Sequence, residues 1–198
     1  MPKYEERFDL ISATGTPEGV NYIVRFYCCI GGAAGLQSAI SRILPNLTLE
    51  TQKLGKRVLT QVASTATTEL SFLAIDTTPT YNNEEEVSLG MAKDTFCIAK
   101  VPKHATTPKQ VRQELQVTLD KIKRKKVDFL LLHWPCDVII AGLLKEVWFA
   151  IEKCIPDRLA STLDVCNFNI TALRMLLPHC EKLRLLVNQQ WDLINFCA

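Results

Sequence analysis

Short apolar runs, each ending in a polar residue, recur along the second part of the chain. They are FLAID (72–76), FCIAK (96–100), FLLLH (129–133), LDVCN (163–167) and LLVNQ (185–189). Apolar runs of this length are typical of strands that are buried on both faces of a parallel sheet. Segments with helical spacing separate the runs, so the pattern predicts successive β-α units.

The segments between the runs carry the start signals and the spacing of amphipathic helices. Thr107 and Pro108 supply an N-cap followed by proline at the first helical position. The apolar residues that follow on one helical face are Val111, Leu115, Leu119 and Ile122. A second helix is expected over 143–151. A third is expected where Asn169 acts as the cap and Pro178 disturbs the end.

The first part of the chain has a weaker pattern. A helix is expected over 56–70, and the residues predicted to share its buried face are Val58, Val62 and Ala66. Residues 21–30 resemble a strand, a helix is expected after Gly31-Gly32, and another helix begins at Trp191. We therefore divide the chain into an N-terminal segment of unassigned role, 1–55, and a β-α region, 56–198.

Composition favours a soluble globular protein. The 198 residues are 47% hydrophobic and 22% charged, and they suggest one domain or two small ones. A net charge of +2 is too small to argue for nucleic acid or an anionic membrane as a partner. No apolar run reaches the length of about 18 residues that suggests a membrane span. The eight cysteines show no CxxC spacing and follow no signal peptide, so we expect reduced thiols, a cytoplasmic protein and no metal site.

Two local patterns each allow two interpretations. The glycines in GGAAG (31–35) could form a phosphate-binding turn, but they match no nucleotide fingerprint and a plain helix start is favoured. The basic run KIKRKK (121–126) could contact nucleic acid. It stands where a helix ends before a strand, and a solvated helix end is favoured because cations suit a helix C-terminus.

The polar residues that end the five runs are the candidate site. In chain order they are Asp76, Lys100, His133, Asn167 and Gln189. Parallel strands of a β/α barrel direct their carboxyl ends to one face, which is where such barrels carry out chemistry. Tyr81 lies in the loop after the first run. The topology therefore predicts that residues far apart in sequence converge.

These residue types suit proton transfer to a carbonyl oxygen. An ammonium such as Lys100 favours ionisation of a nearby phenol, and Asp76 could hold that ammonium in place. His133, when neutral, could orient a carbonyl that Tyr81 protonates as it becomes an alkoxide. A hydride-carrying cofactor is then required. The two amides that end the last runs fit as partners for a carboxamide such as that of nicotinamide.

The landmarks AIDTTPTYNNEEEV, FCIAKVP, VDFLLLHWP, VCNFN and LVNQ resemble, in the correct order, those of the aldo-keto reductases. The resemblance covers about 56–198 and implies an NADP(H)-dependent (β/α)₈ barrel. It implies a catalytic tetrad of Asp76, Tyr81, Lys100 and His133, with Tyr81 as the acid. It also implies nicotinamide contacts from Cys166, Asn167 and Gln189.

The sequence departs from the family pattern at several places. The opening barrel strand has no clear match, and Asp164 stands inside a buried strand where the family has glycine, which is costly unless the acid is paired. Strands seven and eight are absent. We therefore expect an incomplete (β/α)₈ TIM barrel whose open edge is covered by the first 70 residues, by a partner protein or by self-association.

The resemblance implies reduction of a small-molecule aldehyde or ketone to an alcohol by NADPH, with the preference for NADP over NAD left open. Two alternatives stand beside it. One is a binding or regulatory module on an inactive reductase scaffold. The other is a truncated gene product with no function of its own.

Overall fold

The structure is a computed structural model that describes residues 26–29, 48–52, 54–180, 185 and 187–190. The strand expected over 21–30 is described in part, as β1 (Phe26–Cys29). The helices expected after Gly31-Gly32 and from Trp191 lie outside the described residues.

Seven strands of the described chain form one sheet, in the order β1-β7-β6-β5-β4-β3-β2. After β1, the strands are β2 (Thr48–Glu50), β3 (Ala74–Asp76), β4 (Phe96–Val101), β5 (Val127–Leu132), β6 (Ala160–Cys166) and β7 (Val187–Gln190). From β2 to β7 each strand pairs in parallel with the next one in sequence. The prediction of successive β-α units is confirmed, with strands within a few residues of the five apolar runs.

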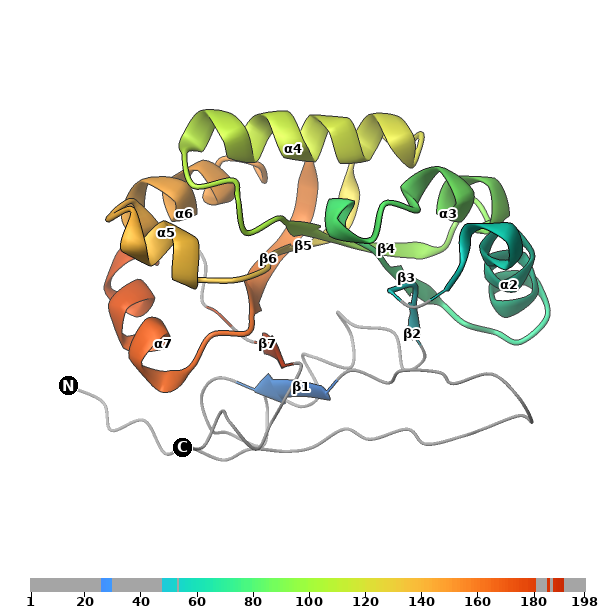
Figure 1. The fold of residues 1–198 in the computed structure, drawn as a ribbon, viewed down its shortest axis with the longest axis horizontal. Helices are drawn as coiled ribbons and strands as arrows, with labels where there is room; N and C mark the ends of the chain where they lie inside the picture. Colours follow the sequence, from blue (N-terminus) through green and yellow to red (C-terminus); the bar gives the residue numbers. More distant parts are fainter. Residues whose placement is uncertain (1–25, 30–47, 53, 181–184, 186, 191–198) are drawn as a thin grey trace.

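The sheet is curled into an incomplete barrel, with helices along its outer side (Figure 1). A side-chain contact demonstrates the curl. Gln189 of β7 donates a hydrogen bond of 2.7 Å to Asp76 of β3. A flat sheet would place these strands about 19 Å apart, across four spacings of about 4.8 Å. The expected incomplete (β/α)₈ barrel is therefore what the described residues form.

The described helices are α2 (Lys56–Thr68), α3 (Glu84–Gly90), α4 (Pro108–Lys121), α5 (Cys136–Ile140), α6 (Leu144–Glu152) and α7 (Ile170–Leu176), with 3₁₀ turns η1 (Pro79–Tyr81) and η2 (Leu177–His179). Both predicted caps are confirmed. Thr107 and Gln110 form a reciprocal capping box at α4, and Asn169 accepts a bond of 2.8 Å from the Ala172 N–H at α7. None of the described helices is long and apolar enough to cross a membrane.

The main core lies between the strands and α4, α6 and α7. The four apolar residues predicted to share a face of α4 are all buried, and Trp148 of α6 is fully buried beside them. Trp148 donates a hydrogen bond of 3.0 Å to Glu152, one turn further along the helix.

The buried face of α2 differs from the prediction. The helix buries Leu59, Ala63 and Ala66, whereas Val58 is 53% exposed. The reason is a close approach to α3: a Cβ at Gly90 would lie 2.1 Å from the Thr60 carbonyl oxygen. Two helix backbones can approach this closely only through small residues, so the alanine face is turned inward.

The opening barrel strand, expected to be missing, is present as β2. It pairs in parallel with β3, and Leu49 is buried against α2 and α3. Its three residues are too few to produce a recognisable apolar run. At the opposite edge, β1 pairs antiparallel with β7, so a segment from the first 70 residues covers that edge.

The buried acid in β6 is hydrogen-bonded. Asp164 is 1% exposed, and its carboxylate accepts bonds of 2.7 Å from the Val187 N–H and 3.2 Å from the Val165 N–H. Because Val187 begins β7, Asp164 joins the two strands. The expected cost of burying this acid is offset by charge-assisted hydrogen bonds.

Candidate active site

A buried ion pair lies at the carboxyl ends of β3 and β4. The Lys100 ammonium contacts one carboxylate oxygen of Asp76, and both side chains are almost fully removed from solvent. The other carboxylate oxygen accepts the 2.7 Å bond from the Gln189 amide. The neighbouring strands β3 and β4 and the distant strand β7 thus meet at one carboxylate. Such a pair is costly to desolvate, and the added hydrogen bond offsets part of that cost.

Tyr81 lies above this ion pair. It ends η1, the 3₁₀ turn that follows β3, and its ring centroid is 5.4 Å from the Lys100 nitrogen. The turn is fixed at both ends, because Thr77 donates to the Ile98 carbonyl at 3.0 Å and Asn82 closes the turn in the left-handed conformation. The half-buried phenol is therefore placed within the field of a buried cation.

His133 follows β5 directly and is 5% exposed. Its backbone N–H donates to the Val101 carbonyl at 3.2 Å, and its carbonyl accepts a bond of 3.1 Å from the Asn167 amide. Its ring lies 5.9 Å from the ring of Trp134. His133 is thus anchored between the ends of β4 and β6, on the same edge of the sheet as Lys100.

Cys166, Asn167 and Gln189 form a connected group beside it. The Cys166 thiol donates to the Gln189 side-chain oxygen at 3.5 Å, and Asn167 donates to the Cys166 sulfur at 3.2 Å. Asn167 has φ of 59°, and its N–H donates to the Gln189 carbonyl at 2.8 Å. Gln189 therefore links this group to Asp76. All seven candidate site residues therefore lie at one edge of the sheet: Asp76, Tyr81, Lys100, His133, Cys166, Asn167 and Gln189.

Sequence analysis missed two residues that brace the site. Thr51, directly after β2, donates through its N–H at 3.2 Å and its hydroxyl at 3.0 Å to the Asp76 carbonyl. Asn83 donates to the Thr51 carbonyl at 2.9 Å. No apolar run precedes Thr51, because β2 reads Thr48-Leu49-Glu50, so the rule that located the other strand ends could not identify it.

Among the described residues, no group of three or more His, Cys, Asp or Glu side chains could hold a metal ion. The donors at this edge are instead an ammonium, a phenol, an imidazole and amides. This set suits hydrogen bonding to an uncharged polar group such as a carbonyl.

The fold and this site define a partial β/α barrel with a polar centre at its carboxyl edge. The sequence model of the Aldo/keto reductase family matches residues 49–192, which is well over half of the chain, and the chain belongs to this family. The family that the sequence motifs resemble is thereby confirmed.

Individual relatives and structures agree with this assignment. The chain is 29% identical over 165 residues to aldo-keto reductase family 1 member C2 of Homo sapiens, a match that covers 65% of this chain and 51% of that protein. It is 30% identical over 115 residues to methylglyoxal reductase DkgA of Salmonella typhimurium, covering 55% and 40%. A solved aldo/keto reductase from Brucella melitensis has the same fold, with a TM-score of 0.66 at 24% identity over 74% of this chain and 58% of that one. The chain spans about half the length of the curated relatives it matches.

Proposed function

We propose that the protein is an NADPH-dependent reductase that converts the carbonyl of a small aldehyde or ketone into an alcohol. The observation that carries this proposal is the buried Lys100–Asp76 pair beneath the ring of Tyr81. A buried ammonium next to a phenol lowers the free energy of the phenolate, and so makes the phenol a better acid. The free cysteines Cys97, Cys136, Cys154, Cys166 and Cys180 are compatible with a reducing, cytoplasmic setting.

In this proposal Tyr81 gives its phenolic proton to the carbonyl oxygen as negative charge develops on it. Lys100 stabilises the phenolate that remains. Asp76 fixes the position of Lys100 and balances its charge. His133 donates a hydrogen bond to the same carbonyl oxygen and orients it for protonation.

The cofactor that supplies the hydride when bound is a reduced nicotinamide. Asn167 and Gln189 carry amides that match a carboxamide in hydrogen-bonding type, and Cys166 lies between them. The residues present therefore fit the group in donor chemistry. Gln189 is already bonded to Asp76, so we propose that it acts on that carboxylate as well as on the cofactor.

The test is the oxidation of NADPH in the presence of a panel of aldehydes and ketones. Tyr81→Phe should lower kcat by roughly 100-fold or more, the usual size of a general-acid contribution. Lys100→Met should be comparably impaired. Lys103→Met changes an exposed lysine in the turn after β4 and should keep wild-type rates. Equal rates for the wild-type protein and Tyr81→Phe would end the proposal.

One observation favours a second candidate, a binding module that does no chemistry. Both ends of the Gln189 amide are bonded within the protein, to Asp76 and to Cys166, which is also how a purely structural glutamine would behave. Trp134, whose ring lies 5.9 Å from that of His133, is a natural reporter. Quenching of tryptophan fluorescence by NADPH is expected for the reductase, and its absence together with a stably co-purifying protein would favour the module.

A further inference from the structure

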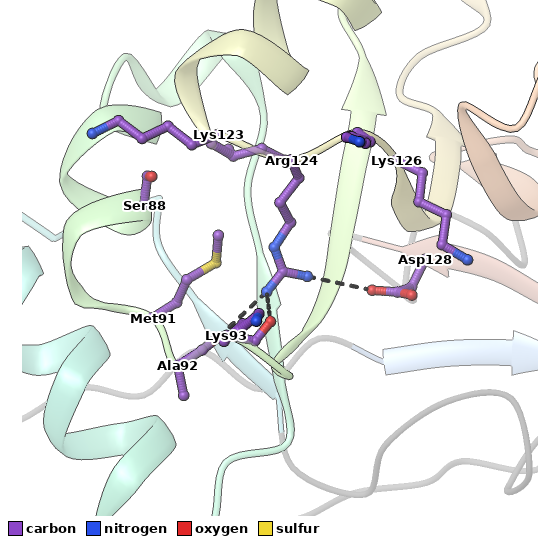
Figure 2. Close-up of a pocket in the computed structure, with 10 residues that line it drawn as sticks. Ser88, Met91, Ala92, Lys93, Lys123, Arg124, Lys126 and Asp128 are labelled. Atoms are coloured by element: carbon purple, nitrogen blue, oxygen red, sulfur yellow. Dashed lines mark hydrogen bonds and ion pairs between the residues drawn. The ribbon is translucent and has the colours of Figure 1, made fainter.

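A basic pocket lies at the opposite edge of the sheet from the reductase site. It has a volume of about 440 Å³ and lies between the end of α3 and the end of α4, beside the starts of β4 and β5 (Figure 2). Its cationic lining residues are Lys93, Lys123, Arg124, Lys125 and Lys126, against the single carboxylate of Asp128. The lining thus carries a net charge of +4, whereas the whole chain carries +2.

The single carboxylate does not neutralise the lysines. Asp128 pairs with Arg124 at 3.6 Å and accepts a bond of 2.9 Å from the Cys97 N–H. Arg124 in turn donates to the carbonyls of Thr95 at 2.7 Å and Lys93 at 2.9 Å. Both groups are therefore used to join the loop before β4 to the start of β5, and they form a fixed wall of the pocket (Figure 2).

The lysines remain as the available charges. Within the described part of the chain, no carboxylate lies within ion-pair distance of Lys93, Lys123 or Lys125. Lys126 donates to the neutral hydroxyl of Ser161 at 3.1 Å. Several unpaired ammonium groups around one concavity raise the local concentration of anions.

Lys123 shows that this arrangement has a cost in backbone energy. It has φ of 54°, in the left-handed region. Its N–H donates to the Asp120 carbonyl at 3.3 Å and the next N–H, of Arg124, donates to Leu119 at 3.0 Å, which is the Schellman motif. Glycine is the usual residue at that position because a Cβ is unfavourable there. Lys123 occupies this position and lines the pocket.

The helix dipole alone does not explain Lys123. The last carbonyls of α4 already accept the two backbone bonds of the Schellman motif. In Figure 2 the Lys123 side chain extends toward the α3 side of the pocket, where Ser88 lies, and so away from the axis of α4.

We propose that this pocket binds a small polyanion of the di- or triphosphate class. Separate ammonium groups are well suited to the multiple oxygens of such a ligand. The site is independent of the reductase proposal. Cys97 of β4 contacts Asp128 in the wall of the pocket. Lys100 of the candidate active site lies three residues further along the same strand, a rise of about 10 Å.

The experiment is calorimetric titration of the 198-residue protein with inorganic tripolyphosphate at 50 and 150 mM salt. Three proteins are compared: wild type, Lys123→Gly and Arg158→Gly. Arg158 also has a left-handed conformation, with φ of 59°, and is an exposed cation that does not line the pocket. Both variants lose one positive charge and relieve the same kind of backbone strain, so both are expected to remain folded with unchanged or higher melting temperatures.

The wild-type protein should bind one tripolyphosphate, more weakly at the higher salt concentration. Lys123→Gly should weaken binding about fivefold, the effect of one exposed ion pair, and Arg158→Gly less than twofold. Failure of the wild-type protein to bind saturably would overturn the proposal. Equal weakening by both variants would also overturn it, because binding would then depend on net charge alone. Tighter binding of a short DNA duplex than of tripolyphosphate at 150 mM salt would reassign the surface to nucleic acid.

Discussion

Replacing Gly90 with alanine tests the packing of α2 against α3. An added Cβ would lie 2.1 Å from the Thr60 carbonyl oxygen and 2.9 Å from the Ala63 Cβ. Ordinary contacts are at 3.4 Å or more, so the two helices must separate by about 1 Å. Alanine in a helix gains about 1 kcal/mol over glycine, and overpacking costs roughly 1–3 kcal/mol or more. Because the strongest overlap is with backbone, we expect the upper end of this cost and a net loss of about 2 kcal/mol.

The measurement is urea denaturation followed by circular dichroism, together with the melting temperature. For a chain of this length the expected loss corresponds to a fall of roughly 4–8 °C. Gly55→Ala is the control, because nothing lies within 4 Å of its added Cβ and its φ is −66°. It should cost about 1 kcal/mol or less, since alanine is a poorer N-cap than glycine but its Cβ meets no other atom.

A double variant sharpens the test. Ala63→Gly removes the 2.9 Å overlap but leaves the 2.1 Å overlap with the Thr60 carbonyl, so it should not rescue Gly90→Ala. If Gly90→Ala were as stable as the wild-type protein, or more so, the close helix approach would be refuted. The inward alanine face of α2 would then need another explanation.

Three further changes have expected outcomes. Asp164→Ala leaves the buried Val187 N–H without its acceptor and should cost about 1–3 kcal/mol in urea denaturation, with Asp164→Asn less harmful; equal stability of all three proteins would contradict the strand-joining role. Thr107→Ala removes the acceptor for the Gln110 N–H and should cost about 1 kcal/mol, and no loss would mean that the capping box is unimportant. Burial raises the pKa of Cys97 from 9.0 to about 12, so the folded state keeps its proton where the unfolded state loses it. The stabilisation from the protonated Cys97 thiol is complete below pH 9 and declines as the pH rises from 9 to 12. In urea denaturation across this pH range, Cys97→Ala should show a smaller loss of unfolding free energy than the wild-type protein.

Much of the barrel could be predicted from sequence because buried parallel strands leave a direct signal. Runs such as FCIAK and FLLLH have no polar residue until the carboxyl end of the strand, so these runs indicated both a strand and its end. The polar residue at that end was therefore a candidate for the site before any contact was known. Lys100 and His133 became candidates in this way. The caps Thr107 and Asn169 could also be predicted, because each capping side chain and the backbone N–H that it binds lie only three residues apart.

The contacts that the sequence did not reveal depend on the curl of the sheet or on short elements. The bond between Gln189 and Asp76 joins residues 113 positions apart, and only the curl of the sheet brings them together. β2 has three residues, which is too short for a periodicity. In α2 the apolar residues Val58 and Val62 compete with a face of small residues, and the decision depends on Gly90 of another helix.

Net charge says little about the proposed anion pocket, for a related physical reason. A value of +2 for the whole chain argues against a polyanionic ligand only if the charges are evenly spread. Here the ends of α3 and α4 bring four lysines and Arg124 to one pocket, and the screening length of about 8 Å at physiological salt lets such a cluster act by itself. At the carboxyl edge of the same strands, the Lys100 charge is balanced by Asp76. The two edges of the sheet therefore differ in whether their cations are paired. One holds a paired cation suited to a neutral carbonyl, and the other holds unpaired cations suited to an anion.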